Sequence, residues 1–509
     1  MIDVPPYGPV RKHQREAIVL ANQVIGTAGM SGSSGGAPRS IKLAHVTPGG
    51  GKTLMCALYA QILIAAGLID RVIWLVPRDS LRSQVVLGFH VHERGLSHEL
   101  KALRTGDGMP NMKQGDMARV VGVCTTFAAV AANPKKFANF AGKGRCLFIS
   151  DECHHCPVDG IADIENEEGA WTAGAAAVLA KSAHALLGTG TLGRSDGKRI
   201  AFVKYDEDSK PIVDIRYTRA MAIAERAVRV IKFYYRDGVG SYQHLGERHE
   251  VQLSTAPSKK TAARAVRAAV AHPSEYRDNE VSHVVEHWKR YRKTTGYSSR
   301  LIIIAATQDS AEYYAKFVAA RYGLKPTLAI SRDPDASRKI QQFRNHPEVS
   351  DTLITVGMAH EGLDVPDCTH LLCLTVIRSE AWLEQAFARV TRFDSKSPIP
   401  YEDQTAFIFV PDDPEMNKVV SLINATEIRA VEERAEGESK ATPRGPSSYI
   451  AEGAIDTTLR YGEEDIKLSE IESDGIRRMI EEVPEFEHKS VSRQLELAYK
   501  FKYLAASSR

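Results

Sequence analysis

A glycine-rich stretch near the start of the chain, VTPGGGKT, has the residue types needed to hold a phosphate group. It runs from Val46 to Thr53, between a short apolar run and a longer one, which is the strand–loop–helix context of a phosphate-binding loop. Glycines let backbone N–H groups converge on phosphate oxygens, and the following helix N-terminus adds partial positive charge. We expect Lys52 to reach the β- and γ-phosphates of a nucleotide and Thr53 to hold Mg²⁺. The residues expected to line the phosphate site are Pro48, Gly49, Gly50, Gly51, Lys52 and Thr53. The strict form of this pattern has glycine at the position of Val46.

A pair of carboxylates, Asp151 and Glu152, stands at the end of a second apolar run, Cys146–Ser150. A carboxylate at the carboxyl end of a strand lies where Mg²⁺ bridges nucleotide phosphates. We therefore expect Asp151 to bind the metal and Glu152 to position and deprotonate an attacking water. Two alternatives remain. The stretch Cys153–Cys156 (CHHC) has the residue types of half a zinc site, or the carboxylates are ordinary strand-end surface groups.

Short apolar runs that alternate with helical stretches must position these residues. Such alternation predicts an α/β fold with parallel strands that are buried on both faces. The predicted strands are Ile41–Val46, Arg71–Val76, Arg119–Cys124, Cys146–Ser150, Ala183–Gly188, Leu301–Ala305, Thr352–Val356, His370–Leu374 and Thr405–Val410. Residues 11–26 read as a helix, and residues 27–40 as a flexible loop. The region 216–299 is expected to be mostly helical, with one strand at Val228–Tyr235.

Length and composition bound the organisation of the chain. The 509 residues suggest about three domains, which we place at 1–215, 216–435 and 436–509. The last of these begins with a polar linker, 436–448, and continues as a small helical C-terminal extension. A hydrophobic fraction of 43% excludes a disordered chain, and a net charge of +3 neither requires nor excludes nucleic acid.

The surroundings of the protein are also indicated by composition. The start of the chain lacks the pattern of a signal peptide. The longest apolar stretch, Met55–Ile69, is interrupted by Gln61 and falls short of the ~20 residues that a membrane span needs, so it predicts a buried helix. Seven scattered cysteines favour a reducing compartment, the cytoplasm, over a disulfide framework.

The loop TPGGGKT and the box Asp-Glu-Cys-His resemble those of the superfamily-two DEAD/DEAH-box helicases, with Cys where that family has Ala. The resemblance implies two tandem RecA-like parallel-sheet domains, with ATP and Mg²⁺ in the cleft between them and nucleic acid across both. Further stretches of the first half match the family in order. They imply that Arg11 and Gln14 read the adenine, that Pro77, Arg78, Thr125 and Thr126 contact nucleic acid, and that Thr189 and Thr191 couple hydrolysis to the grip on the strand.

The second half carries two more motifs of the same family. TVGMAHEGLDVP resembles its fifth motif, which implies that Thr355 contacts the strand and that Gly362 and Asp364 approach the nucleotide. QAFARVTR resembles its arginine motif, with Ala388 in place of Gly. The implied roles are coupling for Gln385, and stabilisation of charge on the γ-phosphate by Arg389 and Arg392.

Within that superfamily, the box and the stretch from Gly190 to Arg199 resemble the restriction- and repair-type helicases of bacteria and their phages. The resemblance implies DNA rather than RNA as the track and partner subunits of a restriction, defence or repair complex. No membrane is expected, because the longest apolar stretch is too short to span one. One alternative is a motor ATPase subunit that does not unwind. Another is a nucleotide-gated scaffold with vestigial hydrolysis, which the intact set Lys52, Asp151, Glu152 and Arg392 disfavours.

A helical stretch that mixes aromatic and basic residues, His287–Tyr297, has two interpretations. It stacks on nucleic acid and neutralises it, or it packs Trp288 and Tyr291 into the second domain, which we favour. No nuclease site is expected, because Pro411–Glu415 lacks the carboxylate–x–Lys partner that such a site needs.

Overall fold

The computed structural model describes residues 10–28, 40–89, 99–104, 120–158, 167–194, 196–271, 274–357, 363, 365–425, 476–481 and 494. The chain divides into two compact units, Met1–Thr218 and Arg219–Arg509, and each is described by itself. No helix among the described residues is both long enough and apolar enough to cross a membrane.

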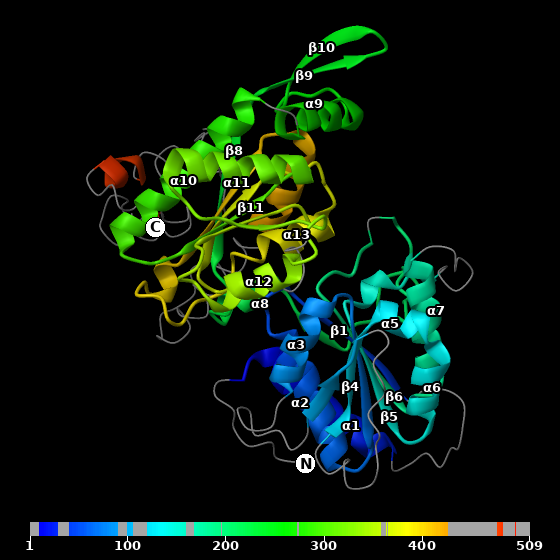
Figure 1. The fold of residues 1–509 in the computed structure, drawn as a ribbon. Coiled ribbons are helices and arrows are strands. Elements are labelled where there is room, and N and C mark those ends of the chain that lie inside the picture. The colour runs from blue at the N-terminus through cyan, green and yellow to red at the C-terminus, as the bar shows by residue number, and fades with distance from the viewer. Residues whose placement is uncertain are drawn as a thin grey trace, which may run out of the picture. The chain divides into compact units, whose positions relative to one another are not determined.

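The first unit is built on a seven-stranded parallel sheet in the order β3-β4-β2-β5-β6-β1-β7. The strands are β1 (Ser40–Val46), β2 (Arg71–Val76), β3 (Glu99–Ala102), β4 (Val120–Thr126), β5 (Cys146–Asp151), β6 (His184–Thr189) and β7 (Ile215–Tyr217). Helices α1 (Lys12–Ala28), α2 (Lys52–Ala65) and α3 (Asp79–Gly88) lie on one side of the sheet. Helices α5 (Phe127–Ala132), α6 (Pro134–Gly142) and α7 (Glu167–Leu179) lie on the other (Figure 1). Strands β2, β5 and β6 are buried along their whole length, because helices cover both faces.

The second unit repeats this plan with a six-stranded parallel sheet in the order β12-β13-β11-β14-β15-β8. Its strands are β8 (Val230–Arg236), β11 (Arg300–Ile304), β12 (Thr327–Ala329), β13 (Thr352–Thr355), β14 (Cys368–Cys373) and β15 (Thr405–Pro411). Its helices are α8 (Arg219–Ala224), α9 (Lys259–Ala271), α10 (Glu275–Thr295), α11 (Gln308–Tyr322), α12 (Ala336–Asn345) and α13 (Glu380–Phe387). Successive residues of β11 enter separate apolar clusters, Ile302 and Ile304 in one, Leu301 and Ile303 in the other. The α/β class with two parallel-sheet domains is thus confirmed, and each strand predicted from an apolar run is present to within two residues.

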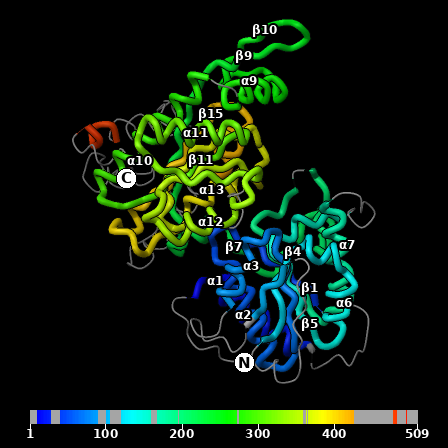
Figure 2. The backbone as a smooth tube through the Cα atoms, viewed as in Figure 1, coloured from blue at the N-terminus to red at the C-terminus, as the bar shows by residue number. Residues whose placement is uncertain are grey.

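The expectation that 216–299 holds a single strand is wrong. An antiparallel hairpin, β9 (Val239–His244) and β10 (Glu247–Gln252), follows β8 and projects from the second unit beside α9 (Figures 1 and 2). His244 pairs with Glu247, so the connecting loop is Leu245-Gly246, and both residues have positive φ, 53° and 83°. That is the turn geometry that matches the twist of a hairpin. Its strands are polar and its loop lacks Asn-Gly, so neither signal marked it in the sequence.

Two predicted helices near the start of the chain and the predicted C-terminal extension can be compared with the structure. The helix expected at 11–26 is α1, and the apolar helix expected at 55–69 is α2, in which Met55 to Leu63 are buried. The linker 436–448 lies outside the described residues, and in the predicted helical extension residues 476–481 are described and are helical.

Candidate active site

The phosphate loop occupies the turn between β1 and α2, and only glycine fits at its centre. Gly50 N–H donates to Thr47 O at 2.9 Å, and a Cβ on Gly50 would lie 2.8 Å from that same oxygen. Gly49 and Gly51 have φ of 80° and 97°, in the left-handed region that glycine adopts without strain. This cradle, followed by the lysine and hydroxyl of Lys52 and Thr53 in the first turn of α2, fits a nucleotide phosphate.

Arg11 and Gln14 contact the backbone of this loop from the start of α1. The Arg11 guanidinium donates to Gly50 O, and Gln14 Nε2 lies 3.4 Å from Gly51 O. Gln14 Oε1 in turn accepts from the backbone N–H of Arg11 at 2.9 Å, which fixes the pair. The structure therefore brings both predicted residues to the phosphate loop, and their reading of adenine stays a prediction. His13 lies between Arg11 and Gln14 in the chain, and the sequence alone did not indicate that it belongs to this site. Burial and the Arg11 charge lower the pKa of its imidazole to about 4, and its ring centroid lies 4.0 Å from that of Tyr217, with the two rings tilted by 30°.

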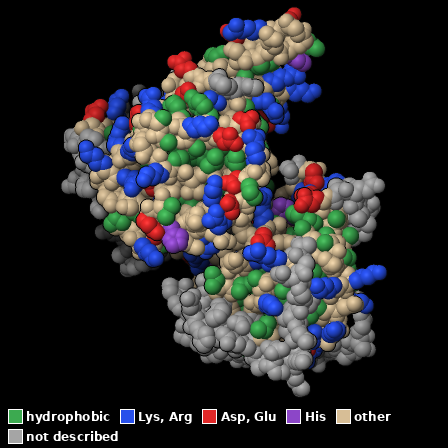
Figure 3. Space-filling view, viewed as in Figure 1, with side chains coloured by type: hydrophobic (Ala, Val, Ile, Leu, Met, Phe, Trp, Pro, Cys, Tyr) green, Lys and Arg blue, Asp and Glu red, His purple; other side chains and the backbone are tan. Residues whose placement is uncertain are grey.

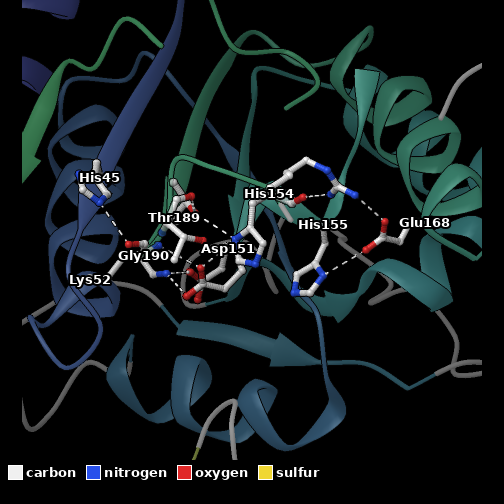
Figure 4. Close-up of polar contacts among 11 residues, drawn as sticks. His45, Lys52, Asp151, His154, His155, Glu168, Thr189 and Gly190 are labelled. Atoms are coloured by element: carbon white, nitrogen blue, oxygen red, sulfur yellow. Dashed lines mark hydrogen bonds and ion pairs between the residues drawn. The ribbon is translucent and has the colours of Figure 1, made fainter. Parts of the chain in front are cut away.

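Lys52 joins the loop to the acidic box at the end of β5 (Figure 4). Its ammonium lies 2.9 Å from Asp151 Oδ1 and also contacts Glu152 Oε1. Burial alone would lower the pKa of Lys52, but the two carboxylates raise it above its ordinary value. Burial raises the pKa of Asp151. Burial also acts to raise the pKa of Glu152, but the charges and hydrogen bonds of Lys52 and His154 together outweigh it, and that pKa falls. Glu152 is consequently ionised at neutral pH, as a general base must be.

The backbone of Glu152 is strained, with φ 54° and ψ 53° in the left-handed region. A non-glycine residue rarely adopts this conformation without surrounding contacts that hold it. Here Glu152 Oε2 accepts a hydrogen bond from Gly190 N–H at 3.0 Å. The carboxylate is thus aimed between Lys52 and the loop that follows β6.

Two histidines contact that loop, His154 from the acidic box, which the sequence had suggested only as part of a zinc site, and His45 from β1, which no pattern marked. His154 Nδ1 lies 3.0 Å from Thr189 Oγ1 and 3.4 Å from Glu152 Oε2. Thr189 Oγ1 donates to Thr191 O at 2.6 Å, which closes the turn. On the other side His45 Nε2 lies 3.1 Å from Gly190 O, and burial lowers the pKa of both imidazoles. The predicted coupling residues Thr189 and Thr191 are therefore within one hydrogen-bonded network with Glu152.

An outer layer supports this network (Figure 4). Arg194 donates to His154 O and lies 2.7 Å from Glu168 Oε2, while His155 Nδ1 lies 3.8 Å from Glu168 Oε1. The zinc alternative finds no support in the part of the chain that the structure describes, where no three His, Cys, Asp or Glu side chains are grouped to hold a metal. Cys153 and Cys156 are buried among apolar side chains, and burial raises the pKa of the Cys156 thiol to about 12.

The residues predicted to contact nucleic acid follow strands of the same sheet. Pro77 and Arg78 come directly after β2, and Thr125 and Thr126 end β4. Because the strands are parallel, these residues lie on the carboxyl edge together with Asp151. Thr125 is fully buried, and Thr126 accepts from Ala129 N–H at 3.1 Å as the cap of α5.

In the second unit the structure brings the arginine motif against the motif that precedes it. Arg389 is buried, and its guanidinium donates to Gln385 O and Leu363 O, each at 3.0 Å. Arg392 lies in a bridge with Val228, next to β8. Thr355 ends β13 with its hydroxyl buried, and Gln385 is buried in α13. Gly362 and Asp364 lie outside the described residues.

Two protein-family models match this chain, one over the motifs of the first unit and the other over the motifs of the second unit. Residues 8–194 match the type III restriction enzyme, res subunit, and residues 283–394 match the helicase conserved C-terminal domain. The chain belongs to the superfamily-two helicases, restriction type. The two helicase domains correspond to the two sheets, and the motifs described above lie within the matched residues or directly beside them.

Relatives of this helicase chain include two uncharacterized mycobacterial proteins. One, of Mycobacterium leprae strain TN, is 29% identical over 461 residues, which cover 89% of this chain and 70% of that protein. The other, of Mycobacterium tuberculosis strain ATCC 25618 / H37Rv, is 28% identical over 420 residues, 82% of this chain and 63% of that protein. The chain thus spans about two thirds of the length of these relatives.

Solved structures show the same tandem RecA-like helicase fold. A fragment of a proposed HsdR subunit of a type I restriction enzyme from Vibrio vulnificus YJ016 has a TM-score of 0.51 at 14% identity, covering 81% of this chain and 66% of that one. The ATP-dependent type ISP restriction-modification enzyme LlaBIII, bound to DNA, has a TM-score of 0.50 at 15% identity. The match covers 84% of this chain and 30% of that one.

A buried arginine just before β8 ties the two motifs of the second helicase domain together, and no local pattern in the sequence marks it. Arg229, fully buried, donates to the carbonyl oxygens of Pro366, Cys368 and Val390 at 2.5, 2.9 and 3.3 Å. Its Nε donates to Gln404 Oε1 at 3.0 Å. Among the described residues no carboxylate pairs with it, so four neutral oxygens solvate the charge. Pro366 belongs to one motif and Val390 to the other, while Cys368 begins β14 and Gln404 precedes β15.

The aromatic residues in the mixed aromatic and basic stretch of α10 pack into the second domain, which is the interpretation that we favoured from the sequence. Trp288 and Tyr291 are buried in an apolar cluster, which confirms the packing interpretation. Arg292 lies 2.6 Å from Asp351, just before β13, so this helix places its cations at the amino edge of the sheet. After β15, Asp413 is engaged by Arg378 at 2.8 Å and caps Met416 N–H, a structural role.

Proposed function

We propose that this chain is an ATP-hydrolysing motor that moves along DNA in the cytoplasm. The observation that carries the proposal is the arrangement of Lys52 beneath a glycine cradle, in contact with both Asp151 and Glu152. Lysine, a metal-binding carboxylate and an ionised base at one edge of a parallel sheet form the set that phosphoryl transfer to water requires.

The residues of the chain suggest how turnover proceeds. Lys52 exchanges its carboxylate partners for the β- and γ-phosphates of ATP, which frees Asp151 and the Thr53 hydroxyl to hold the metal. Mg²⁺, when bound, neutralises charge on those phosphates. Glu152 then orients a water molecule and accepts its proton; before ATP binds, Lys52 and His154 hold the pKa of this carboxylate down, so it enters the cycle ionised. The bond from Glu152 to Gly190 passes the change to the Thr189–Thr191 loop, and from there to the grip on DNA.

The restriction-type family favours a motor that serves a larger complex. The first matched model is named for the res subunit of a restriction enzyme, and one similar structure is a restriction-modification enzyme bound to DNA. We infer that double-stranded or single-stranded DNA is the track and that partner subunits supply other activities. Translocation without strand separation is the second candidate, and the same family match supports it.

A panel of nucleic acids tests the proposal. We expect steady-state ATPase activity of the full chain to rise on addition of DNA, and to rise less with RNA of equal length. Displacement of a labelled strand, run beside a translocation assay on duplex DNA, separates unwinding from movement alone. Turnover that is the same with and without every nucleic acid in the panel contradicts the motor.

Arg392 tests whether the two helicase domains share one active site. We propose that Arg392 reaches the γ-phosphate during turnover, because the side chain of Arg389 is held by carbonyls of its own domain. Arginines of this kind are worth roughly 10³–10⁵ in rate, and we expect Arg392→Ala to lose on the order of 10²-fold or more. Lysine should not rescue it, because an ammonium lacks the planar fork.

The measurement is turnover with saturating DNA for Arg392→Ala and Arg392→Lys, beside ATP affinity. Affinity should change far less than turnover, since the contact strengthens in the transition state. Arg290→Ala, an exposed arginine on α10, is the matched control and should keep parental activity. Near-parental turnover in both Arg392 variants would mean that the second domain does not take part in hydrolysis.

A further inference from the structure

Helix α9 carries a stripe of basic side chains that none of the motifs uses. Lys260, Arg264 and Arg267 are exposed and spaced at i, i+4 and i+7, so they share one face of the helix. Figure 3 shows Lys and Arg side chains gathered over α9. Residues 251–274 contain four Lys or Arg and neither Asp nor Glu. Among the described residues, no carboxylate pairs with the three stripe residues, so their charges face solvent uncompensated.

The opposite face of α9 is fixed to the domain. Ala262, Ala265, Val266, Ala269 and Val270 are buried, and β9 packs directly on the helix. A Cβ on Gly240 of β9 would lie 2.3 Å from Ala265 O, so glycine permits this close approach. Packing therefore holds α9 in one orientation, with its basic face toward solvent.

The stripe lies at the same edge of the second sheet as Thr355. Ser310 and Tyr314, in the first turns of α11 after β11, donate to Ala271 O and Val270 O at 3.0 and 3.2 Å. Lys259 pairs with Glu415, which follows β15, at 3.1 Å. Because β8, β11, β13 and β15 run parallel, these anchors place α9 at their carboxyl edge. Arg292, near the end of α10, lies at the opposite edge.

We propose that α9 is a second DNA contact of this domain, in which Lys260, Arg264 and Arg267 bind backbone phosphates without reading sequence. The seven-residue separation from Lys260 to Arg267 spans about 10.5 Å along the helix. Each DNA strand carries one phosphate per ~3.4 Å of duplex axis, so this length matches roughly three phosphates. The proposal rests on the motor function above and extends its track beyond the helicase motifs. Phosphate is the complement of a stripe that holds three cations and no acid.

The experiment measures binding of fluorescent duplex and single-stranded DNA by the full chain over a salt series. For K260Q/R264Q/R267Q we expect the slope of log affinity against log salt to fall by about 2 to 3, and affinity near 0.1 M salt to fall on the order of 10- to 100-fold. Ala263→Lys, which adds a cation to the same exposed face, should steepen the slope by about 0.7 to 0.9. ATP turnover without DNA should stay at the parental rate in all of these variants.

The control removes the same charge elsewhere on the domain. R290Q/K293Q/K316Q changes three exposed cations of α10 and α11 and should shift affinity less than about threefold, as screened long-range charge does. A stripe variant that matches this control overturns the proposal and leaves an acidic protein partner as the occupant of α9. A parental chain that binds no DNA overturns the motor function itself, so the two failures are distinguishable.

Discussion

Lys52→Ala is expected to reduce ATP turnover to the background of the assay, the largest effect of any single substitution in this chain. Lys52 is the one described cation that contacts both Asp151 and Glu152 at the mouth of the glycine cradle. Without it the γ-phosphate loses a fixed positive partner, and the two carboxylates repel the nucleotide. We therefore expect weaker ATP binding as well as lost turnover.

The same substitution has a cost in stability that must be measured beside activity. The side chains of Asp151 and Glu152 are only 8% and 17% exposed, and removing their cation leaves neighbouring buried carboxylates unpaired. Breaking buried pairs of this kind costs about 3–5 kcal/mol, part of which proton uptake by Asp151 will relieve. Thermal unfolding should show a lowered but cooperative transition.

Lys42→Ala is the matched control for Lys52. Lys42 also lies in the first unit and pairs with a carboxylate, Asp214, at 2.8 Å, but Asp214 is not part of the acidic box and the Lys42 side chain is 26% exposed. It should keep parental turnover with a small change in stability. Turnover by Lys52→Ala at the parental rate would show that the phosphate loop is not the hydrolytic site.

Glu152→Gln is expected to bind ATP and fail to hydrolyse it. The amide has the shape of the carboxylate and its Oε can still accept from Gly190 N–H, but it cannot take a proton from water. General-base catalysis contributes typically 10²–10⁴-fold, and we expect a loss in this range. Because ATP stays bound, the variant should also hold DNA more tightly in the presence of ATP than the parent does.

The measurements for Glu152→Gln are fluorescent-nucleotide binding, steady-state turnover and DNA retention with ATP. Glu168→Gln, a carboxylate in the adjoining layer that Arg194 holds, is the control and should turn over within a few fold of the parent. Unchanged turnover, or lost ATP binding, in Glu152→Gln would assign the base to another residue.

The sequence was sufficient to predict the sheets because parallel strands buried on both faces appear as plain apolar runs. It was insufficient for β3, β7 and β12, each of three or four residues at or near a sheet edge, and for the polar β9–β10 hairpin. Strands this short carry too few residues for a pattern, and pairing with a neighbour stabilises them.

The phosphate loop and the acidic box could be predicted because their residues are adjacent in the chain. His45 and Arg229 could not, because their partners lie 145 residues away for His45 and 137 to 175 residues away for Arg229. A single buried histidine in a strand, or an arginine just before one, has no local pattern, and its partners are defined only once the strands are in register.

Arg229 couples the positions of two motif loops in the second helicase domain, because one guanidinium contacts both of them. Its guanidinium is solvated by oxygens from Pro366 on one loop and Val390 on the other, with no carboxylate to accompany it if either loop departs. Moving one loop alone would take one of the four oxygens away from a buried cation, which costs free energy because the lost hydrogen bond is not replaced by water. We therefore expect a displacement that begins beside Pro366 to be passed through Arg229 to Val390 and the adjoining Arg392.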